Sequence, residues 1–229
     1  MQNLGTATPL GRPRQSGIVT EDPREEILAV AAQLFARKGY AATQMKEVAR
    51  ESGLAQSSIY YWFRSKSEIL RAIIDQNRES LRVLSLLKNR EDPAAIRLYI
   101  VLYQDIVQMC EAPLNFYDLE AAASAQPDVF TDFHTDYDAL AQGLESIVAD
   151  GIASSEFVDV PISGFVRTAL SLNEGTQHRY RTEAAAGADM RLYADLAVTT
   201  SVRSILRDVT TMSSVQKFAR RGIDGLSAA

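Results

Sequence analysis

Helix start and stop signals follow one another closely in the N-terminal third of the chain, and their spacing restricts the fold more than any other feature. Asp22 precedes a proline and stands three residues before Glu25, which is the pattern of a helix N-cap with a capping-box acid. Gly39 and Gly53 each follow apolar residues at helical spacing, as glycines that end helices do. Residues 65–68 (Ser-Lys-Ser-Glu) form another capping box. Short helices joined by tight turns are therefore predicted here.

A tight turn at Gly53 separates the second of these helices from the third. Thr43 can cap the second helix, and the third helix is predicted at residues 56–63. Two short helices joined in this way are typical of a helix-turn-helix, whose second helix enters the major groove of DNA. The alternative is that the aromatic run at residues 60–62 packs against a helical body.

The outer face of the third helix suits contact with DNA. Ile59 and Phe63 lie one turn apart and are predicted to face inward. Since successive helical residues are about 100° apart, Ser57 and Tyr61 point the opposite way. Small hydroxyl side chains allow close approach to the groove, while Tyr and Gln side chains reach phosphates and base edges.

Phosphate contacts are expected beside this face. Thr43 and Lys66 each lie at the N-terminus of a neighbouring helix, where free backbone N–H groups attract phosphate. Nearer the start of the chain, Arg12 and Arg14 could enter the minor groove, and the alternative is a solvated tail with incidental arginines. The predicted DNA-binding residues are Thr43, Gln56, Ser57, Ser58, Tyr60, Tyr61 and Lys66.

Beyond Pro93 the chain keeps helical periodicity and shows few strand signals. Helices are predicted at residues 93–111, 114–125, 127–151, 161–182 and 188–210. A long fourth helix, opened by the capping box at residues 65–68, is predicted to run toward Leu87. The predicted fold class is all-α, with an N-terminal three-helix helix-turn-helix domain joined by the long fourth helix to a larger helical body.

Charge is divided unevenly along the chain, whose formal net charge is −5. Residues 1–75 hold ten Lys and Arg against eight Asp and Glu, whereas residues 76–229 hold 14 against 21. A mildly basic N-terminal part followed by an acidic remainder is expected if only the N-terminal part binds phosphate. The acidic remainder disfavours a non-specific architectural protein, which needs a broad positive surface.

The sequence lacks the signals of a membrane protein, a secreted protein or a metal site. No apolar run approaches the roughly 20 residues that span a bilayer, so a cytoplasmic protein without a membrane partner is expected. The lone Cys110 fits a reducing compartment and is predicted to be a buried structural thiol rather than a redox switch. His134 stands in an acidic run that is predicted to form a solvated helix face rather than a metal site. No cofactor and no metal are expected.

An enzyme is the second class of function that the helical body could serve. Glu120, His134 or Glu174 could act as acid-base groups. However, no nucleophile elbow, glycine-rich phosphate loop or paired Cys or His motif accompanies them. We therefore expect the protein not to be an enzyme.

Residues 39–74 resemble the N-terminal domain of the tetracycline-repressor (TetR) family. The similarity is carried by residues 48–54 (Val-Ala-Arg-Glu-Ser-Gly-Leu) and 58–70 (Ser-Ile-Tyr-Tyr-Trp-Phe-Arg-Ser-Lys-Ser-Glu-Ile-Leu), whose order and spacing are highly specific. The resemblance implies a phosphate-facing set, Thr43, Tyr60, Trp62 and Lys66, and a base-facing set, Gln56, Ser57 and Tyr61. Two positions depart from the family pattern. Ala55 replaces the usual capping Ser or Thr, and Trp62 can donate only through its indole N–H.

The resemblance also implies roles for the helical body. Members of the family form two-fold dimers through their last two long helices, here residues 161–182 and 188–210, and bind small molecules in this part of the chain. Candidate interface residues are Phe165, Ala169, Leu172, Leu192, Leu196 and Leu206, and an internal core is the alternative for them. Candidate effector-binding residues are Tyr103, Phe116, Tyr117, Tyr137, Asn173 and Gln177.

Together these features predict a sequence-specific DNA-binding transcriptional regulator. The leading hypothesis is a homodimeric repressor that leaves a palindromic operator in duplex DNA when a small-molecule effector binds. An activator, or a repressor that needs a corepressor, would use the same parts. The predicted domains are a flexible arm (residues 1–20), a helix-turn-helix DNA-binding domain (21–68), an effector-binding and dimerisation domain (69–212) and a C-terminal tail (213–229).

Overall fold

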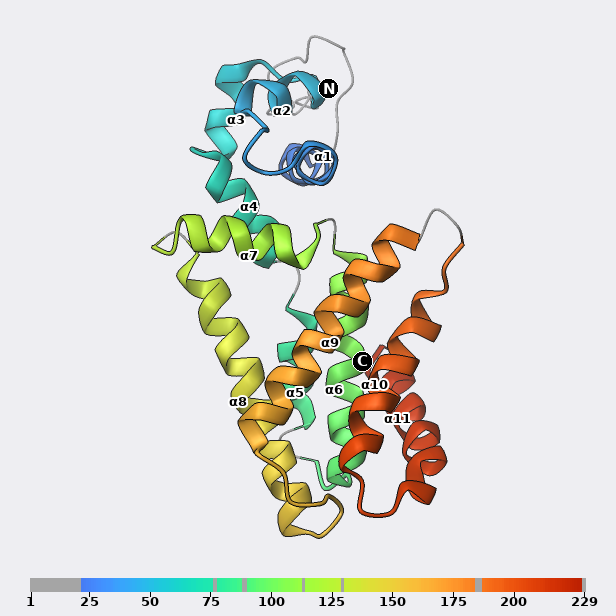
Figure 1. The fold of residues 1–229 in the computed structure, drawn as a ribbon. Coiled ribbons are helices and arrows are strands. Elements are labelled where there is room, and N and C mark those ends of the chain that lie inside the picture. The colour runs from blue at the N-terminus through green and yellow to red at the C-terminus, as the bar shows by residue number, and fades with distance from the viewer. Residues whose placement is uncertain are drawn as a thin grey trace, which may run out of the picture. The chain divides into compact units, whose positions relative to one another are not determined.

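The computed structural model describes residues 22–75, 78–87, 90–112, 114–128, 130–183 and 187–227. Helices make up most of this part of the chain (Figure 1), so the predicted all-α fold is confirmed. An isolated β-bridge pairs Phe157 with Leu206. The predicted arm, with Arg12 and Arg14, lies outside the described residues.

The chain divides into two compact units, and their boundary lies between Ala72 and Ile73. The helices are α1 (Pro23–Lys38), α2 (Met45–Glu51), α3 (Gln56–Trp62), α4 (Lys66–Asp75), α5 (Glu79–Leu87), α6 (Ala94–Glu111), α7 (Phe116–Ala125), α8 (Thr131–Ala153), α9 (Ile162–Glu183), α10 (Met190–Ile205), the 3-10 turn η2 (Val209–Thr211) and α11 (Met212–Ser227). The first unit therefore contains α1 to α3 and most of α4, and the second unit contains the helices from α5 onward.

Capping signals define α1 as predicted. The Asp22 side chain accepts hydrogen bonds from the backbone N–H groups of Arg24 (2.9 Å) and Glu25 (3.2 Å). Gly39 ends the helix with a φ of 82°, which residues with a side chain rarely adopt. The predicted apolar face is buried, with Ile27, Leu28, Ala31, Leu34 and Phe35.

The cap of α2 differs from the prediction. Gln44, and not Thr43, is the N-cap residue, and its backbone N–H donates to Glu47 Oε2 (3.0 Å). The buried Thr43 hydroxyl instead donates to the Gly39 carbonyl (2.9 Å). Because that hydroxyl is bonded to the end of α1, the predicted Thr43 cap is wrong.

The predicted long fourth helix is in fact two helices. α4 ends at Asp75, and α5 is a separate helix that follows Arg78. Arg78 forms ion pairs with Asp75 (3.1 Å) and with Asp136 of α8 (2.7 Å). The Ser80 N–H, which an unbroken helix would bond internally, donates to the Gln108 side chain of α6 (2.8 Å). Side chains from distant segments thus provide the hydrogen-bond and ion-pair partners at the start of the new helix.

α6 is the centre of the second unit, with α5, α8, α9, α10 and α11 packed against it (Figure 1). Its sequence is apolar on most sides, and a helix that is hydrophobic all round is a buried helix. Tyr99, Leu102 and Ile106 are wholly buried there. The second unit is therefore a helical bundle whose core surrounds α6.

Most helix ends in this unit lie within a few residues of their predicted positions, but α10 ends at Ile205 instead of residue 210. The Ile205 carbonyl accepts a hydrogen bond from the Val158 N–H (2.8 Å), and Leu206 forms the bridge with Phe157. This pairing with the segment at residues 157–158 ends the helix at Ile205.

The predicted C-terminal tail is wrong for residues 213–227, which belong to α11. Val215 and Ala219 lie one turn apart and are buried. Gly222 allows close packing on α6, since a Cβ there would lie 2.8 Å from Ile100 Cδ1. The apolar stripe gives the segment a surface to bury, and this favours the helix.

Candidate nucleic-acid interface and ligand pocket

The outer face of α3 is the candidate surface for DNA. Ile59 and Phe63 are buried, as predicted, whereas Tyr61 is 82% exposed. Tyr60 and Trp62 are 44% and 40% exposed, and the Tyr61 and Trp62 rings meet edge to face with centroids 5.3 Å apart. These aromatic side chains are therefore not part of the core of the first unit, which disfavours the alternative that they pack against a helical body. Three partly exposed rings on a seven-residue helix leave an apolar surface for a partner.

Polar side chains complete this face. Gln56 and Ser57 are exposed and Ser58 is half-buried, so α3 presents amide and hydroxyl groups beside its aromatic rings. Ala55 is the N-cap residue and provides no side-chain cap, as predicted from its methyl group. Amide and hydroxyl groups can bond to base edges and phosphates in a major groove.

Lys66 is placed differently from the prediction. Its Nζ donates to three carbonyl oxygens between α1 and α2: Tyr40 (2.5 Å), Ala41 (3.2 Å) and Thr43 (2.9 Å). Burial lowers the pKa of this ammonium from its ordinary value, while the carbonyl acceptors favour its charged form. The ammonium therefore holds the α1–α2 turn, and neither it nor the Thr43 hydroxyl is left free for a phosphate. No sequence signal marks this role, because the carbonyls lie 23 to 26 residues earlier in the chain.

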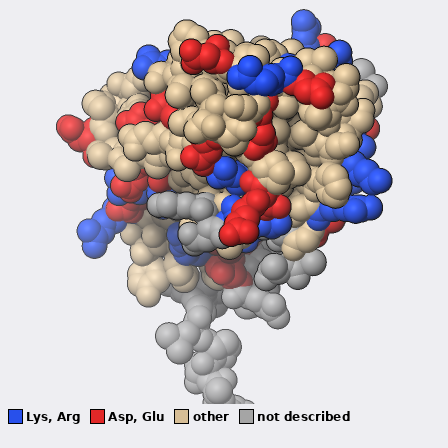
Figure 2. All heavy atoms as spheres, turned by 90° about the horizontal axis from the view of Figure 1, so that it is seen from below, with Lys and Arg blue, Asp and Glu red and all other residues tan. Residues whose placement is uncertain are grey.

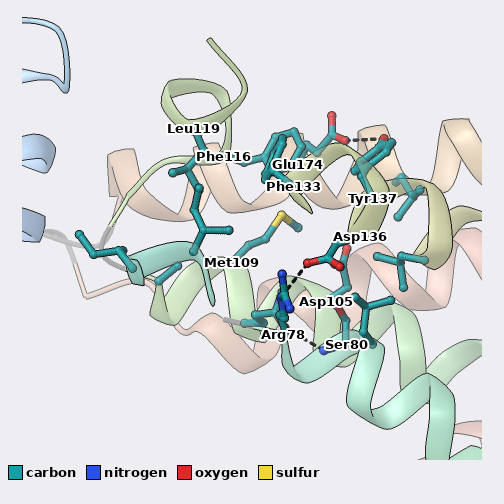
Figure 3. A pocket seen from close by; sticks show the side chains of 17 residues that line it. Arg78, Ser80, Asp105, Met109, Phe116, Leu119, Phe133, Asp136, Tyr137 and Glu174 are labelled. Carbon is teal, nitrogen blue, oxygen red and sulfur yellow. Dashed lines mark hydrogen bonds and ion pairs between the residues drawn. The ribbon is translucent and has the colours of Figure 1, made fainter. Parts of the chain in front are cut away.

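A pocket lies in the second unit, formed by the last turn of α4 and by α5, α6, α7, α8 and α9 (Figure 3). It encloses about 100 Å³. Much of its wall is apolar or aromatic, with Met109, Leu119, Phe133 and Leu140 among the lining side chains. Pockets of this kind, with a few polar groups in an apolar wall, are typical of small-molecule sites.

Of the six predicted effector-binding residues, Phe116 and Tyr137 line this pocket. Tyr103 lies on another side of α6, where its ring stacks on Tyr99 with centroids 6.4 Å apart. Tyr117 is exposed on α7. Residue type alone suggested all four tyrosine and phenylalanine candidates, but helix packing decides which of them face the cavity.

Asn173 and Gln177 lie behind the pocket wall and are fully buried. Asn173 Nδ2 donates to the Leu102 carbonyl (3.1 Å) and to Asp105 Oδ2 (2.9 Å). Gln177 Nε2 donates to the Met109 carbonyl (3.3 Å). These two predicted residues therefore hold α9 against α6 and position pocket residues instead of lining the cavity.

Three carboxyl groups outside the predicted effector set, those of Asp105, Asp136 and Glu174, line the pocket. Asp105 is buried, and this burial raises the pKa of its carboxyl to about 6, against the opposing effect of its hydrogen bond with Asn173. Glu174 accepts a hydrogen bond from the Tyr137 hydroxyl (3.0 Å; Figure 3), and burial raises the pKa of this carboxyl too. The pocket thus combines aromatic rings with acidic groups.

Comparison with known proteins agrees with this geometry. The uncharacterized HTH-type transcriptional regulator YfiR of Bacillus subtilis (strain 168) is 29% identical over 163 residues, which cover 68% of this chain and 78% of that protein. The HTH-type transcriptional repressor KstR2 of Rhodococcus jostii (strain RHA1) is 27% identical over 148 residues, 61% of this chain and 72% of that protein. Residues 27–73 match the family model described as bacterial regulatory proteins, tetR family. These residues therefore carry the DNA-binding domain of the TetR family.

The TetR-family fold extends over both units. The crystal structure of AmtR from Mycobacterium smegmatis matches with a TM-score of 0.68 at 25% identity, over 93% of this chain and 99% of that chain. A tetR-family regulatory protein from Rhodococcus RHA1 matches in fold with a TM-score of 0.70 at 20% identity, over 82% of this chain and 100% of that chain. The protein is a DNA-binding transcriptional regulator, as predicted, and these named relatives are regulators rather than enzymes.

Other features of the protein bear on the remaining predictions. On the face shown in Figure 2, positive and negative side chains are interspersed, which does not favour an architectural DNA protein. Across the described ranges, no helix has the length and apolar character needed to cross a membrane. The same residues contain no group of three or more His, Cys, Asp and Glu that could hold a metal ion. Cys110 is half-buried, and burial raises the pKa of its thiol to about 11, which keeps it protonated.

Proposed function

We propose that the protein is a cytoplasmic, homodimeric repressor that binds a palindromic operator through α3 and leaves it when a small molecule enters the pocket. The exposed Tyr61 face of α3 carries the proposal. KstR2 is named a repressor, and SmeT, a fold neighbour at 18% identity and a TM-score of 0.62, has been solved in complex with triclosan. FasR of Mycolicibacterium smegmatis, 27% identical, is named an activator, so activation is the second candidate.

The proposed division of roles follows the exposure of the side chains. Gln56, Ser57 and Tyr61 face base edges, with Ser58 beside them, while Tyr60 and Trp62 lie along phosphates. Thr43 and Lys66 act indirectly by holding the turn before α2. We assign DNA binding to residues 21–68 and effector binding with dimerisation to the helical unit that follows.

Tyr61→Ala is expected to weaken operator binding by roughly tenfold or more, because a good base contact is worth about 1–3 kcal/mol. The melting temperature should stay unchanged, since the side chain is 82% exposed. Fluorescence anisotropy with fragments of the gene's own upstream region and excess competitor DNA measures the affinity. A reporter driven by the same region separates repression from activation.

Tyr117→Ala is the matched control for this variant, since Tyr117 is an exposed tyrosine of the other unit. Its operator affinity should equal that of the wild type. If Tyr61→Ala also binds like the wild type, the assignment of α3 as the reading surface is wrong. If no fragment survives competition with the wild type, the proposal of a specific operator fails.

Exposed leucines on α9 and α10, which pack against each other, support the proposed dimer. Leu172, Leu192 and Leu196 are 38%, 53% and 60% exposed. Of the other predicted interface residues, Phe165 is half-buried, and Ala169 and Leu206 are buried in the core of the unit. Exposed apolar side chains on neighbouring helices are typical of an interface, and a two-fold dimer would cover the same face on both copies.

The double variant Leu192→Glu with Leu196→Glu is expected to be monomeric, because each charge would be buried in the interface twice. Size-exclusion chromatography with light scattering measures the mass. Leu86→Glu, at a 43% exposed leucine of α5, is the control and should leave the dimer intact. A monomeric wild type, or a double variant that still dimerises, would refute this interface.

A further inference from the structure

The pocket of the second unit contains more negative than positive charge. Its charged lining residues are the acidic Asp105, Asp136 and Glu174 and the basic Arg78. Arg78 is already paired with Asp136, at 2.7 Å. The carboxyl groups of Asp105 and Glu174 are therefore left without a counter-charge from the pocket itself.

Neutral groups are the hydrogen-bond partners of these two carboxyls. Asp105 Oδ2 accepts from Asn173 Nδ2 (2.9 Å), and Glu174 Oε1 accepts from the Tyr137 hydroxyl (3.0 Å). Neither carboxyl forms an ion pair with any residue that the structure describes. Burial raises both pKa values, so ionising these groups in the empty pocket is less favourable than in water. Carboxyl groups whose pKa values are raised and which line a cavity are candidates for a binding site.

Aromatic rings stand beside the acidic groups. The Phe116 ring lies 6.0 Å from the Phe133 ring and 6.1 Å from the Tyr137 ring, measured between centroids, and all three side chains line the pocket (Figure 3). The faces of aromatic rings attract cations. The enclosed volume is about 100 Å³. Because an apolar cavity of about 150 Å³ holds benzene, this volume favours a ligand body no larger than one ring.

We infer that the pocket binds a small organic cation, a protonated amine on an apolar body of about one ring, with Asp105 and Glu174 as its counter-charges. The inference rests on the proposed function, since it names the effector class for the same pocket. The ammonium supplies the missing positive charge, and the aromatic rings cover the apolar body. A carboxylate ligand would meet two like charges, and a neutral ligand would leave both carboxyls unpaired, so both should bind more weakly.

Benzylamine, benzyl alcohol and benzoate test the ligand charge at nearly constant shape. In calorimetric titrations of the full chain at neutral pH, benzylamine should bind at least about tenfold more tightly than benzyl alcohol, and benzoate more weakly than either. Asp105→Asn should weaken benzylamine binding by about tenfold or more and change benzyl alcohol binding by less than about twofold. Asp138→Asn removes an exposed carboxylate of α8 outside the pocket lining and should bind benzylamine like the wild type.

Asp105→Asn should fold, because it removes a carboxyl whose ionisation burial opposes. A melting curve checks this, and Glu174→Gln repeats the test if Asp105→Asn does not fold. The inference is overturned if benzyl alcohol or benzoate binds as tightly as benzylamine, if benzylamine does not bind at millimolar concentration, or if the folded pocket variant keeps its benzylamine affinity.

A parallel gel shift with an operator fragment separates this inference from the proposed function. Release of the operator by benzylamine supports both. Release by benzyl alcohol or benzoate alone supports a ligand-controlled repressor and overturns the cation assignment. Tight benzylamine binding without release supports the cation site and contradicts the effector role of the pocket.

Discussion

Gly151→Ala is expected to lower the free energy of unfolding of the second unit by about 2–3 kcal/mol, the range typical of an overpacked core. A Cβ at this position of α8 would lie 2.1 Å from Cδ2 of Phe157. The Phe157 ring is wholly buried, so it has no solvent-filled space into which it can turn. Either the ring or the helix must therefore shift.

The backbone around Phe157 opposes such a shift. The Phe157 N–H donates to the Gly151 carbonyl (2.9 Å), and the Val158 N–H donates to the Ile205 carbonyl (2.8 Å). The Arg207 guanidinium donates to the Phe157 carbonyl (3.1 Å). Moving the ring would strain these bonds, which also hold the end of α10.

Gly225→Ala is the matched control, because a Cβ at Gly225 of α11 meets nothing within 4 Å. An alanine is preferred over a glycine in a helix by up to about 1 kcal/mol, so this variant should be as stable as the wild type or slightly more stable. Denaturation with urea, followed by circular dichroism, compares the two. If both variants unfold at the same urea concentration, Gly151 is not constrained by Phe157.

Local signals predicted most of the helices, because caps and apolar periodicity act within a few residues. Asp22 and Gly39 bound α1 through their own backbone geometry. The break between α4 and α5 depends instead on a hydrogen bond from Ser80 to Gln108, a residue of another helix. A continuous helical pattern cannot show that a distant side chain will satisfy a second helix start.

The prediction of a tail at residues 213–229 was wrong for a different reason, because the helical spacing of apolar residues in α11 is present in the sequence. Val215 and Ala219 follow a helical spacing, and the helix is strongly amphipathic. The segment also contains several charged residues, among them Lys217, Arg220 and Arg221. They occupy positions between the buried ones, as expected for a helix with one apolar side.

The two candidate sites differ in how far the sequence could predict them. The inward and outward faces of α3 follow from the 3.6-residue period, so Ile59 and Tyr61 were placed correctly. The pocket depends on which sides of α6, α8 and α9 meet. Polar residues such as Asn173 satisfy backbone groups there, while Asp105 faces the cavity, and a single sequence does not distinguish these two environments.

Lys66→Met is expected to destabilise the first unit by about 2–3 kcal/mol, because hydrogen bonds to a charged group each contribute about 1.5–3 kcal/mol and water can replace only the exposed ones. The variant keeps the apolar stem of the side chain and removes the donor that joins Tyr40, Ala41 and Thr43. Hydrogen exchange of the α1–α2 turn, read by mass spectrometry, should show faster opening. Operator affinity should fall because α2 and α3 lose their support.

The salt dependence of binding separates this indirect role from a direct phosphate contact. A lysine that neutralises one phosphate lowers the slope of log Kd against log salt by about one when it is removed. If the Lys66 ammonium is occupied by carbonyls, Lys66→Met should weaken binding with little change in slope, measured where the variant is still folded. Lys46→Met removes an exposed charge from α2 and controls for the loss of a lysine in the exchange experiment. A lower slope with unchanged exchange would instead assign Lys66 to the phosphate backbone, as the sequence alone predicted.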